Sequence, residues 1–121
     1  MRYSEYSDAF WKKQKCDGGS RPPDQITCVV IHSTEGETAV GGARTLTTRT
    51  DASVQIVVDD STTYRIVPEL VVPCGVKDVN FWTLHIEQAG IAAWSTRKWL
   101  ERFKTIQRAA YWTAGWMYKY Q

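Results

Sequence analysis

Residues 26–36 read Ile-Thr-Cys-Val-Val-Ile-His-Ser-Thr-Glu-Gly, and the interpretation of the whole chain starts from this stretch. Its first six residues are apolar or β-branched and carry no charge, which is typical of a central strand covered on both faces. His32 closes this predicted strand, where side chains begin to point into the space above the edge of the sheet. A histidine at a strand end is more often structural than functional, so position alone leaves both roles open.

The segments that follow predict a mixed sheet with helices packed on it. Residues 38–48 predict a helix, although two glycines and several threonines lower its propensity. Residues 51–69 predict a β-hairpin, because apolar alternation resumes after an acidic turn at 59–62. Residues 81–88 predict another strand, and a long helix begins after Ser95. Its expected apolar stripe consists of Trp99, Phe103, Ile106, Ala110 and Met117. This order of elements indicates an α/β or α+β domain.

Length and composition exclude several classes of protein. The chain has 121 residues, enough for one small domain, in which residues 1–24 form an N-terminal extension and residues 25–121 the main part. With 43% hydrophobic and 23% charged residues it is not disordered, and a net charge of +2 is too weak to predict a nucleic-acid partner. Its apolar runs are far shorter than the ~20 residues of a membrane span. We expect no signal peptide, because no apolar stretch follows the first residues.

Three cysteines stand at long, unpatterned spacings, at Cys16, Cys28 and Cys74. A zinc ribbon or thioredoxin-like site is excluded, because no Cys-x-x-Cys pair is present. The preferred interpretation is three free thiols packed as small hydrophobic residues in a reducing cytosol. A Cys28–Cys74 disulfide is the alternative.

The second histidine, His85, lies in the predicted strand 81–88. Strand alternation puts Leu84 and Ile86 on one face, and His85 with Glu87 on the other. A histidine and a carboxylate two residues apart on one face lie within ~7 Å, close enough to interact or to share a metal-centred site. The alternative is the solvent-facing polar side of a half-covered sheet.

Together these segments resemble the type 2 N-acetylmuramoyl-L-alanine amidases, which share a fold with the peptidoglycan-recognition proteins. Residues 28–36 are similar to the family's first zinc-ligand strand, and residues 53–69 to its next hairpin, with a Tyr-x-x-Val-Pro-Glu pattern at 64–69. Residues 80–87 are similar to the family's strand that ends in Ile-Glu. The resemblance runs from residue 26 to residue 121 and implies a central mixed sheet flanked by helices.

The resemblance also implies a function: a zinc-dependent peptidoglycan hydrolase that cleaves the amide bond between N-acetylmuramic acid and L-alanine. His32 would be a zinc ligand, and Glu87 the catalytic acid–base residue that activates water. Thr34 and Asn80 are expected in the substrate cleft or directly behind the site. His85 stands where the family usually has a small residue, so its role is not inherited; its place near Glu87 leads us to expect that it orients this carboxylate. Without a signal peptide, the implied protein is a phage endolysin that is made in the host cytoplasm and acts on the bacterial cell wall, with neither nucleic acid nor membrane as a partner.

The chain departs from the family in its metal ligands. The family's other zinc ligands lie beyond the long helix, so the matched segment supplies one ligand where a catalytic zinc needs about three. We therefore interpret the chain as the N-terminal part of an amidase domain, lacking its C-terminal segment. Alone it is expected to be inactive, to bind zinc weakly, and to pair with that segment or with itself. The alternatives are a non-catalytic peptidoglycan-binding module of the same fold and an interaction domain that uses the aromatic helix.

Overall fold

The computed structural model describes residues 3–121 and shows a mixed α/β architecture. The elements in chain order are η1 Pro23–Gln25, β1 Cys28–Ser33, α1 Ala39–Thr48, β2 Ile56–Val58, β3 Thr63–Arg65, η2 Asn80–Trp82, β4 Thr83–Gln88, α2 Thr96–Glu101 and α3 Phe103–Lys119. The predicted helix, hairpin and strands are therefore confirmed, with bounds that shift by a few residues. Within residues 3–121, no helix combines the length and the apolar character that crossing a membrane requires.

The four strands form one mixed sheet in the order β1-β4-β2-β3. β1 and β2 both run parallel to β4, whereas β2 and β3 are antiparallel. The prediction of a mixed sheet is confirmed, but the prediction that β1 is a central strand is wrong. β1 lies at the edge, and Ile31 is 46% exposed. An apolar run shows that a strand packs against something, but it does not tell which neighbours pair with its backbone.

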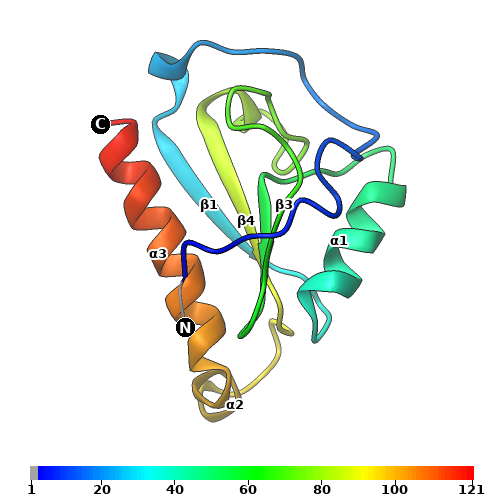
Figure 1. Cartoon of the computed structure of the whole chain (residues 1–121), viewed down its shortest axis with the longest axis vertical. Coiled ribbons are helices and arrows are strands. Elements are labelled where there is room, and N and C mark those ends of the chain that lie inside the picture. Colours follow the sequence, from blue (N-terminus) through cyan, green and yellow to red (C-terminus); the bar gives the residue numbers. More distant parts are fainter. Residues whose placement is uncertain (1–2) are drawn as a thin grey trace.

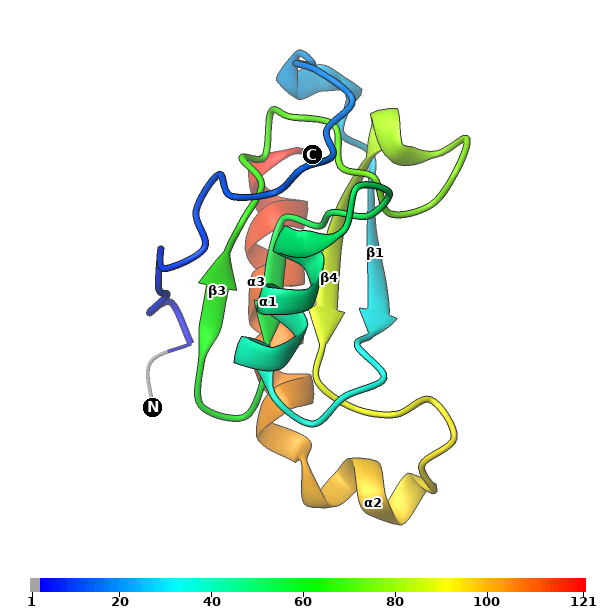
Figure 2. The ribbon, with the colours of Figure 1, turned by 90° about the vertical axis from the view of Figure 1, so that its right-hand side faces the viewer.

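The sheet is covered on both faces, but unequally (Figures 1 and 2). α3 packs across β1, β4 and β2 on one face, over a core that includes Ile86 and Trp116. α1 packs on the other face, mainly over β2 and β3, in a second core around Ala43 and Val57. The part of this second face that belongs to β1 and β4 is therefore left without a helix.

The turn of the hairpin holds the start of α1 in place. Asp59 is buried, and its Oδ1 accepts hydrogen bonds from the backbone N–H groups of Ser61 and Thr62. Its Oδ2 accepts a bond from the N–H of Ala39, the first residue of α1. Thr38 caps the same helix through Gly41. The acidic turn thus satisfies both its own backbone and the end of the helix that borders the open face.

The expected single long helix is wrong in two respects. Arg102 has non-helical backbone angles and separates α2 from α3. The buried face of α3 consists of Thr105, Arg108, Ala109 and Trp116, whereas Phe103 and Met117 of the predicted stripe are 49% and 65% exposed. Because the helix is interrupted at Arg102, the residues of α3 do not continue the face that begins in α2, and the predicted stripe is not the buried face. α2 is held separately by Trp99, whose ring fills the place that a side chain at Gly90 would need.

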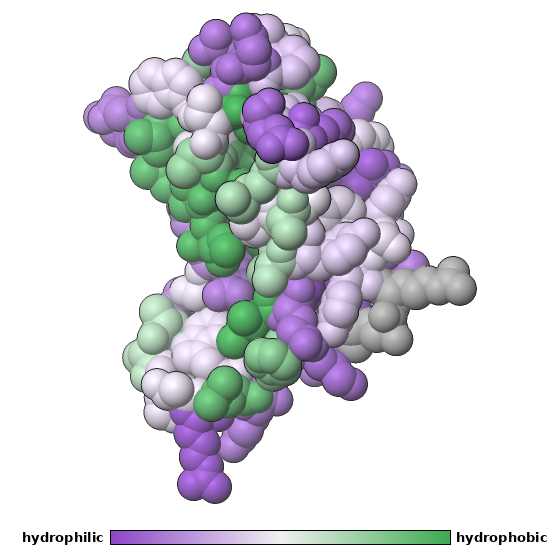
Figure 3. All heavy atoms as spheres, turned by 90° about the vertical axis from the view of Figure 1, so that its left-hand side faces the viewer, coloured by the Kyte–Doolittle hydropathy of each residue, from purple (hydrophilic) through white to green (hydrophobic). Residues whose placement is uncertain are grey.

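The outer side of β1 carries an apolar groove against α3. A cavity of about 360 Å³ lies between the two elements and is lined by residues that include Ile26, Val29 and Met117. The space-filling view of the α3 side shows apolar side chains gathered on one side of this face (Figure 3). The expectation that this surface pairs with a further segment or a second copy stays a prediction.

The N-terminal extension runs along the outer edge of β3 (Figure 1). Ser7 exchanges backbone hydrogen bonds with Thr63 and Arg65, and Asp8 forms an ion pair with Arg65 at 2.9 Å.

The prediction of three free thiols is wrong, because Cys16 forms a disulfide with Cys74. The alternative Cys28–Cys74 bridge is excluded as well, since Cys28 is free and exposed. The sequence could not identify the pairing because 58 residues separate the partners.

Arg21 anchors the end of this extension in the main body. Its side chain is only 4% exposed, and its guanidinium donates to the carbonyl oxygens of Glu69, Asn80, Phe81 and Thr83 at 2.7–3.2 Å. The acceptors belong to the loop after β3, to η2 and to the start of β4. One buried cation therefore connects three segments that are distant in sequence.

We predict that Arg21→Ala lowers the free energy of unfolding by about 3 kcal/mol or more, because it leaves several buried carbonyl groups without donors. Urea denaturation followed by tryptophan fluorescence measures the loss. Arg97→Ala is the matched control, since Arg97 is exposed on α2, and it should change stability by less than about 0.5 kcal/mol. Equal stability of the two variants would contradict the anchoring role.

Candidate active site at the carboxyl ends of β1 and β4

The parallel pairing of β1 with β4 brings the predicted site residues onto one face. His32 stands opposite Glu87 in the register, and Val30 stands opposite His85. Residues paired in this way point to the same side of a sheet. His32, His85 and Glu87 therefore share the face that α1 leaves open over β1 and β4. The prediction that His32 and Glu87 point into the same cleft is confirmed for the shared sheet face, but only Glu87 lines the pocket described next.

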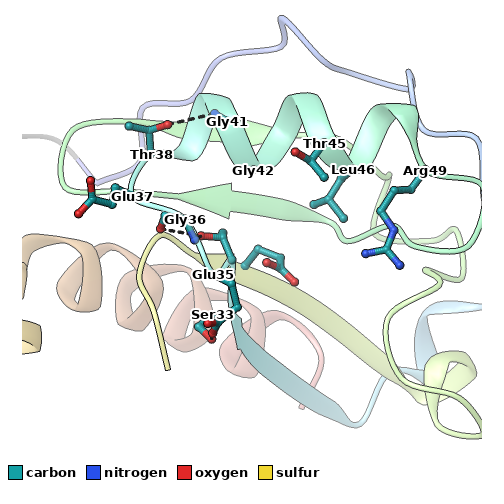
Figure 4. Close-up of a pocket in the computed structure, with 12 residues that line it drawn as sticks. Ser33, Glu35, Gly36, Glu37, Thr38, Gly41, Gly42, Thr45, Leu46 and Arg49 are labelled. Carbon is teal, nitrogen blue, oxygen red and sulfur yellow. Dashed lines mark hydrogen bonds between the residues drawn. The ribbon is translucent and has the colours of Figure 1, made fainter. Parts of the chain in front are cut away.

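A pocket of about 540 Å³ opens beside Glu87, between β4 and α1 (Figure 4). Its walls are the loop after β1, the exposed side of α1 and the end of β4. Figure 4 shows Leu46 and Arg49 extending from the region of α1 toward this space. The lining residues are Ser33, Thr34, Glu35, Gly36, Glu37, Thr38, Gly41, Gly42, Thr45, Leu46, Arg49 and Glu87. His32 lies on the same sheet face but does not line the pocket.

Glu87 has an unusual electrostatic environment. Burial raises the pKa of Glu87 to about 7, because its charged form is poorly solvated there. The positive charge of Arg49 works in the opposite direction, whereas the negative charge of Glu35 adds to the increase. At neutral pH, a carboxyl group with this pKa exists in comparable amounts as acid and as carboxylate. It is thus suited to take up and release a proton.

The loop between β1 and α1 gives the pocket a fixed rim. Glu35 adopts a left-handed backbone conformation, with φ 58°, and its carboxylate accepts bonds from the Ser33 hydroxyl at 2.6 Å and the Ala92 N–H at 2.9 Å. Thr34 Oγ1 accepts from the N–H of Gly36 at 3.1 Å. Thr34 therefore lies in the pocket, as expected for a cleft residue, and at the same time shapes its rim.

The placement of His85 differs from both sequence expectations. The ring is completely buried, so it does not form a solvent-facing polar side. Its Nδ1 lies 2.7 Å from Nε2 of His32, and its Nε2 lies 2.6 Å from Oγ1 of Thr83. Both ring nitrogens are thereby occupied, and neither bond goes to Glu87. The expectation that His85 orients Glu87 is wrong; its partner is His32.

Three further residues shape the surroundings of the His85 ring, and of these only Asn80 was given a place near the site from the sequence. Gly75 has no side chain where the ring lies, since a Cβ there would stand 2.1 Å from Nδ1 of His85. Asn80 holds this close approach, because its Oδ1 accepts bonds from the N–H groups of Gly75 and Val76. Gln55 accepts a bond from the backbone N–H of His85 at 2.7 Å. Asn80 therefore supports the histidine pair from behind and does not line the pocket.

The donor set does not complete a zinc centre. Among residues 3–121, no group of three or more histidine, cysteine, aspartate or glutamate side chains is arranged to hold a metal ion. A catalytic zinc requires about three protein ligands and an open position. One neighbour of His32 that could add a nitrogen ligand, His85, already directs both ring nitrogens into hydrogen bonds. The described residues supply part of such a site and do not fit the ion on their own.

Solved structures with this fold exist. The chain is similar to the structure of PlyL, with a TM-score of 0.75 and 15% identity over 96% of this chain and 74% of that one. It is also similar to the Staphylococcus aureus hydrolase AmiA in complex with its ligand, with a TM-score of 0.66 and 20% identity over 96% and 54%. A third similar structure is the catalytic domain of XlyA, with a TM-score of 0.50 and 19% identity over 82% of this chain and 76% of that one.

These likenesses confirm the fold that the sequence resemblance implied. No protein-family model matches the sequence, and no curated protein matches it significantly. At identities of 15–20% the likeness concerns the fold, and the chain spans about half the length of the AmiA chain.

We predict that Gly75→Ala displaces the His85 ring and costs about 1–3 kcal/mol of stability, because the added methyl group would overlap a buried ring. Thermal unfolding measures the loss, and a two-dimensional NMR spectrum reports the ring shift. The control is Gly115→Ala on the exposed side of α3, where a Cβ meets nothing within 4 Å. This control should gain up to about 1 kcal/mol from helix propensity. Stabilisation in both variants would contradict the packing of His85 against Gly75.

Proposed function

We propose that this chain carries the substrate cleft of a peptidoglycan hydrolase, an N-acetylmuramoyl-L-alanine amidase of the endolysin type. The observation that carries the proposal is the position of Glu87. A carboxyl group whose pKa is raised to about 7 lines a pocket of about 540 Å³ and stands opposite His32 across a parallel strand pair. The likeness in fold to the hydrolase AmiA and to the catalytic domain of XlyA supports it.

Glu87 is the proposed general base. Amide hydrolysis needs a water molecule to lose a proton as it attacks the carbonyl carbon, and the departing amine must then gain one. A carboxyl group with a pKa near the working pH serves both transfers. Because Glu87 lines the pocket, its carboxyl group can reach an amide bond that is bound there.

The size and lining of the pocket suit part of a glycopeptide. Volumes of roughly 300–1,000 Å³ are typical of pockets for small ligands. The lining residues include the hydroxyl-bearing Thr34, Thr38 and Thr45, and Arg49 supplies a cation. Threonine hydroxyls both donate and accept hydrogen bonds, as sugar hydroxyls and peptide amides require.

Zinc dependence belongs to the same proposal, with His32 as the ligand from this chain. In a site completed by further ligands, a bound zinc ion would polarise the amide carbonyl and lower the pKa of bound water. Because residues 3–121 do not bring together three donors, the 121-residue chain should bind zinc weakly and should not hydrolyse cell walls by itself. Elemental analysis and release of amino groups from purified walls measure the two properties.

A non-catalytic wall-binding module is the second candidate. The specific observation in its favour is the incomplete donor set among the described residues. Both candidates require the pocket to hold peptidoglycan, and they differ in hydrolysis. Since the chain alone should not digest walls under either candidate, the test uses the chain extended by a segment that supplies the missing zinc ligands. Wall digestion by this longer protein would support the hydrolase, and binding without digestion would support the module.

We predict that the chain sediments with insoluble peptidoglycan and that Thr45→Trp reduces the bound fraction several-fold, because an indole at this position fills the pocket. Thr48→Trp is the matched control, since Thr48 is exposed on the same helix and does not line the pocket. It should bind like the parent chain. The proposal fails if the parent chain does not sediment with the walls, or if the two variants bind equally well.

A further inference from the structure

We propose that His85 and Thr83 are positioning residues that hold the proton of His32 on Nε2 and leave its Nδ1 as a free electron-pair donor. The proposal follows from a continuous series of hydrogen bonds behind His32. These hydrogen bonds link His32 to His85, His85 to Thr83, and Thr83 to the backbone carbonyl of Val79.

The donor and acceptor roles in this series of hydrogen bonds are set by the Thr83 hydroxyl. Oγ1 of Thr83 lies 3.0 Å from the carbonyl oxygen of Val79 and 3.4 Å from that of Asn80. A carbonyl oxygen only accepts, so the single hydroxyl proton of Thr83 points toward it. Oγ1 must then accept the proton of His85 Nε2, at 2.6 Å. A neutral imidazole carries one proton, which makes Nδ1 of His85 an acceptor.

The next step fixes His32. Its Nε2 lies 2.7 Å from Nδ1 of His85, which is a hydrogen-bond distance and requires a proton between the two nitrogens. Since His85 accepts there, His32 donates from Nε2. The remaining nitrogen of His32, Nδ1, then carries a lone pair, and within the described part of the chain it makes no hydrogen bond.

The opposite assignment of donors and acceptors is less favourable. If the Thr83 hydroxyl donated to His85, His85 would donate to His32, and the proton of His32 would move to Nδ1. Oγ1 of Thr83 would then face the carbonyl oxygen of Val79 at 3.0 Å with no proton between the two oxygens. Two electron-rich oxygens at this distance repel each other. The observed geometry therefore favours donation toward Val79.

The surroundings keep the rings uncharged, so that each carries one proton. His85 is completely buried, and burial disfavours the charged form of an imidazole ring. The hydrogen bonds define where the proton sits on a neutral ring, at any pH at which both rings are neutral.

A fixed tautomer has a functional consequence. An imidazole nitrogen that donates to a partner leaves its other nitrogen directed outward as a ligand, which is how histidines are commonly oriented for metals. The role of Nδ1 as a ligand rests on the proposed function. The tautomer itself does not, because it follows from the hydrogen bonds alone.

The test is an NMR measurement of the ring nitrogens in the metal-free chain, labelled with ¹⁵N-histidine and kept in EDTA at pH 7.5. The chain holds only two histidines, so a His85→Asn variant assigns the signals. Two-bond ¹H–¹⁵N correlations distinguish protonated from unprotonated ring nitrogens. We expect His32 to be protonated at Nε2 and unprotonated at Nδ1. A proton on Nδ1 of His32, or rapid averaging of both forms, would overturn the proposal.

Thr83→Val separates positioning from simple packing. Without the hydroxyl acceptor, His85 should carry its proton on Nδ1 and donate to His32, whose own proton should then move to Nδ1. Thr105→Val is the matched control, because Thr105 is also buried but lies on α3, and its hydroxyl has no hydrogen-bond partner among residues 3–121. It should leave the His32 signals unchanged. An unaltered His32 tautomer in folded Thr83→Val would refute the role of Thr83; if this variant does not fold, the parent spectrum decides.

Wall binding distinguishes the tautomer from the proposed function. Sedimentation with peptidoglycan tests the pocket, whereas the NMR measurement uses no substrate and no metal. A chain that shows the expected tautomer but does not bind walls would retain this inference and lose the function. If the chain binds walls but His32 carries its proton on Nδ1, the proposed function is retained and the tautomer inference fails.

Discussion

The backbone pairing of β1 with β4 is the interaction on which the site depends. Parallel pairing in this register aligns His32 with Glu87 and brings His85 beside His32. A shift of one residue would turn either set of side chains toward α3 and into the apolar core. The packing of Leu84 and Ile86 under α3 opposes such a shift. The hydrophobic side of β4 therefore specifies where its polar side points.

Unequal coverage of the sheet turns this alignment into a pocket. α1 covers β2 and β3, and its own start is tied to the hairpin turn by Asp59. The remaining space beside β4 is enclosed enough to raise the pKa of Glu87 but open enough to admit a ligand. A carboxyl group in open solvent would not have this property, and one under a helix would not be reached by substrate.

Local patterns predicted which side chains share a face better than they predicted what surrounds these side chains. The two-residue period of the predicted strand 81–88 placed His85 and Glu87 on one face, whereas His32 was assigned to the site by the family resemblance. The partner of His85 could not be predicted, because it depends on strand order and on the missing side chain at Gly75. The edge position of β1, the break at Arg102 and the Cys16–Cys74 disulfide are likewise set by contacts between distant segments.

The ionisation of Glu87 tests the central claim most directly, since the pocket matters for chemistry only if it perturbs this carboxyl group. A ¹³C NMR titration of the glutamate carboxyl carbons, with Glu87→Gln to assign the signal, measures its pKa. The account predicts a midpoint near 7, because burial raises the pKa from the ordinary value of 4.5. A midpoint close to 4.5 would show a solvated carboxylate and would contradict the assignment of Glu87 as the base.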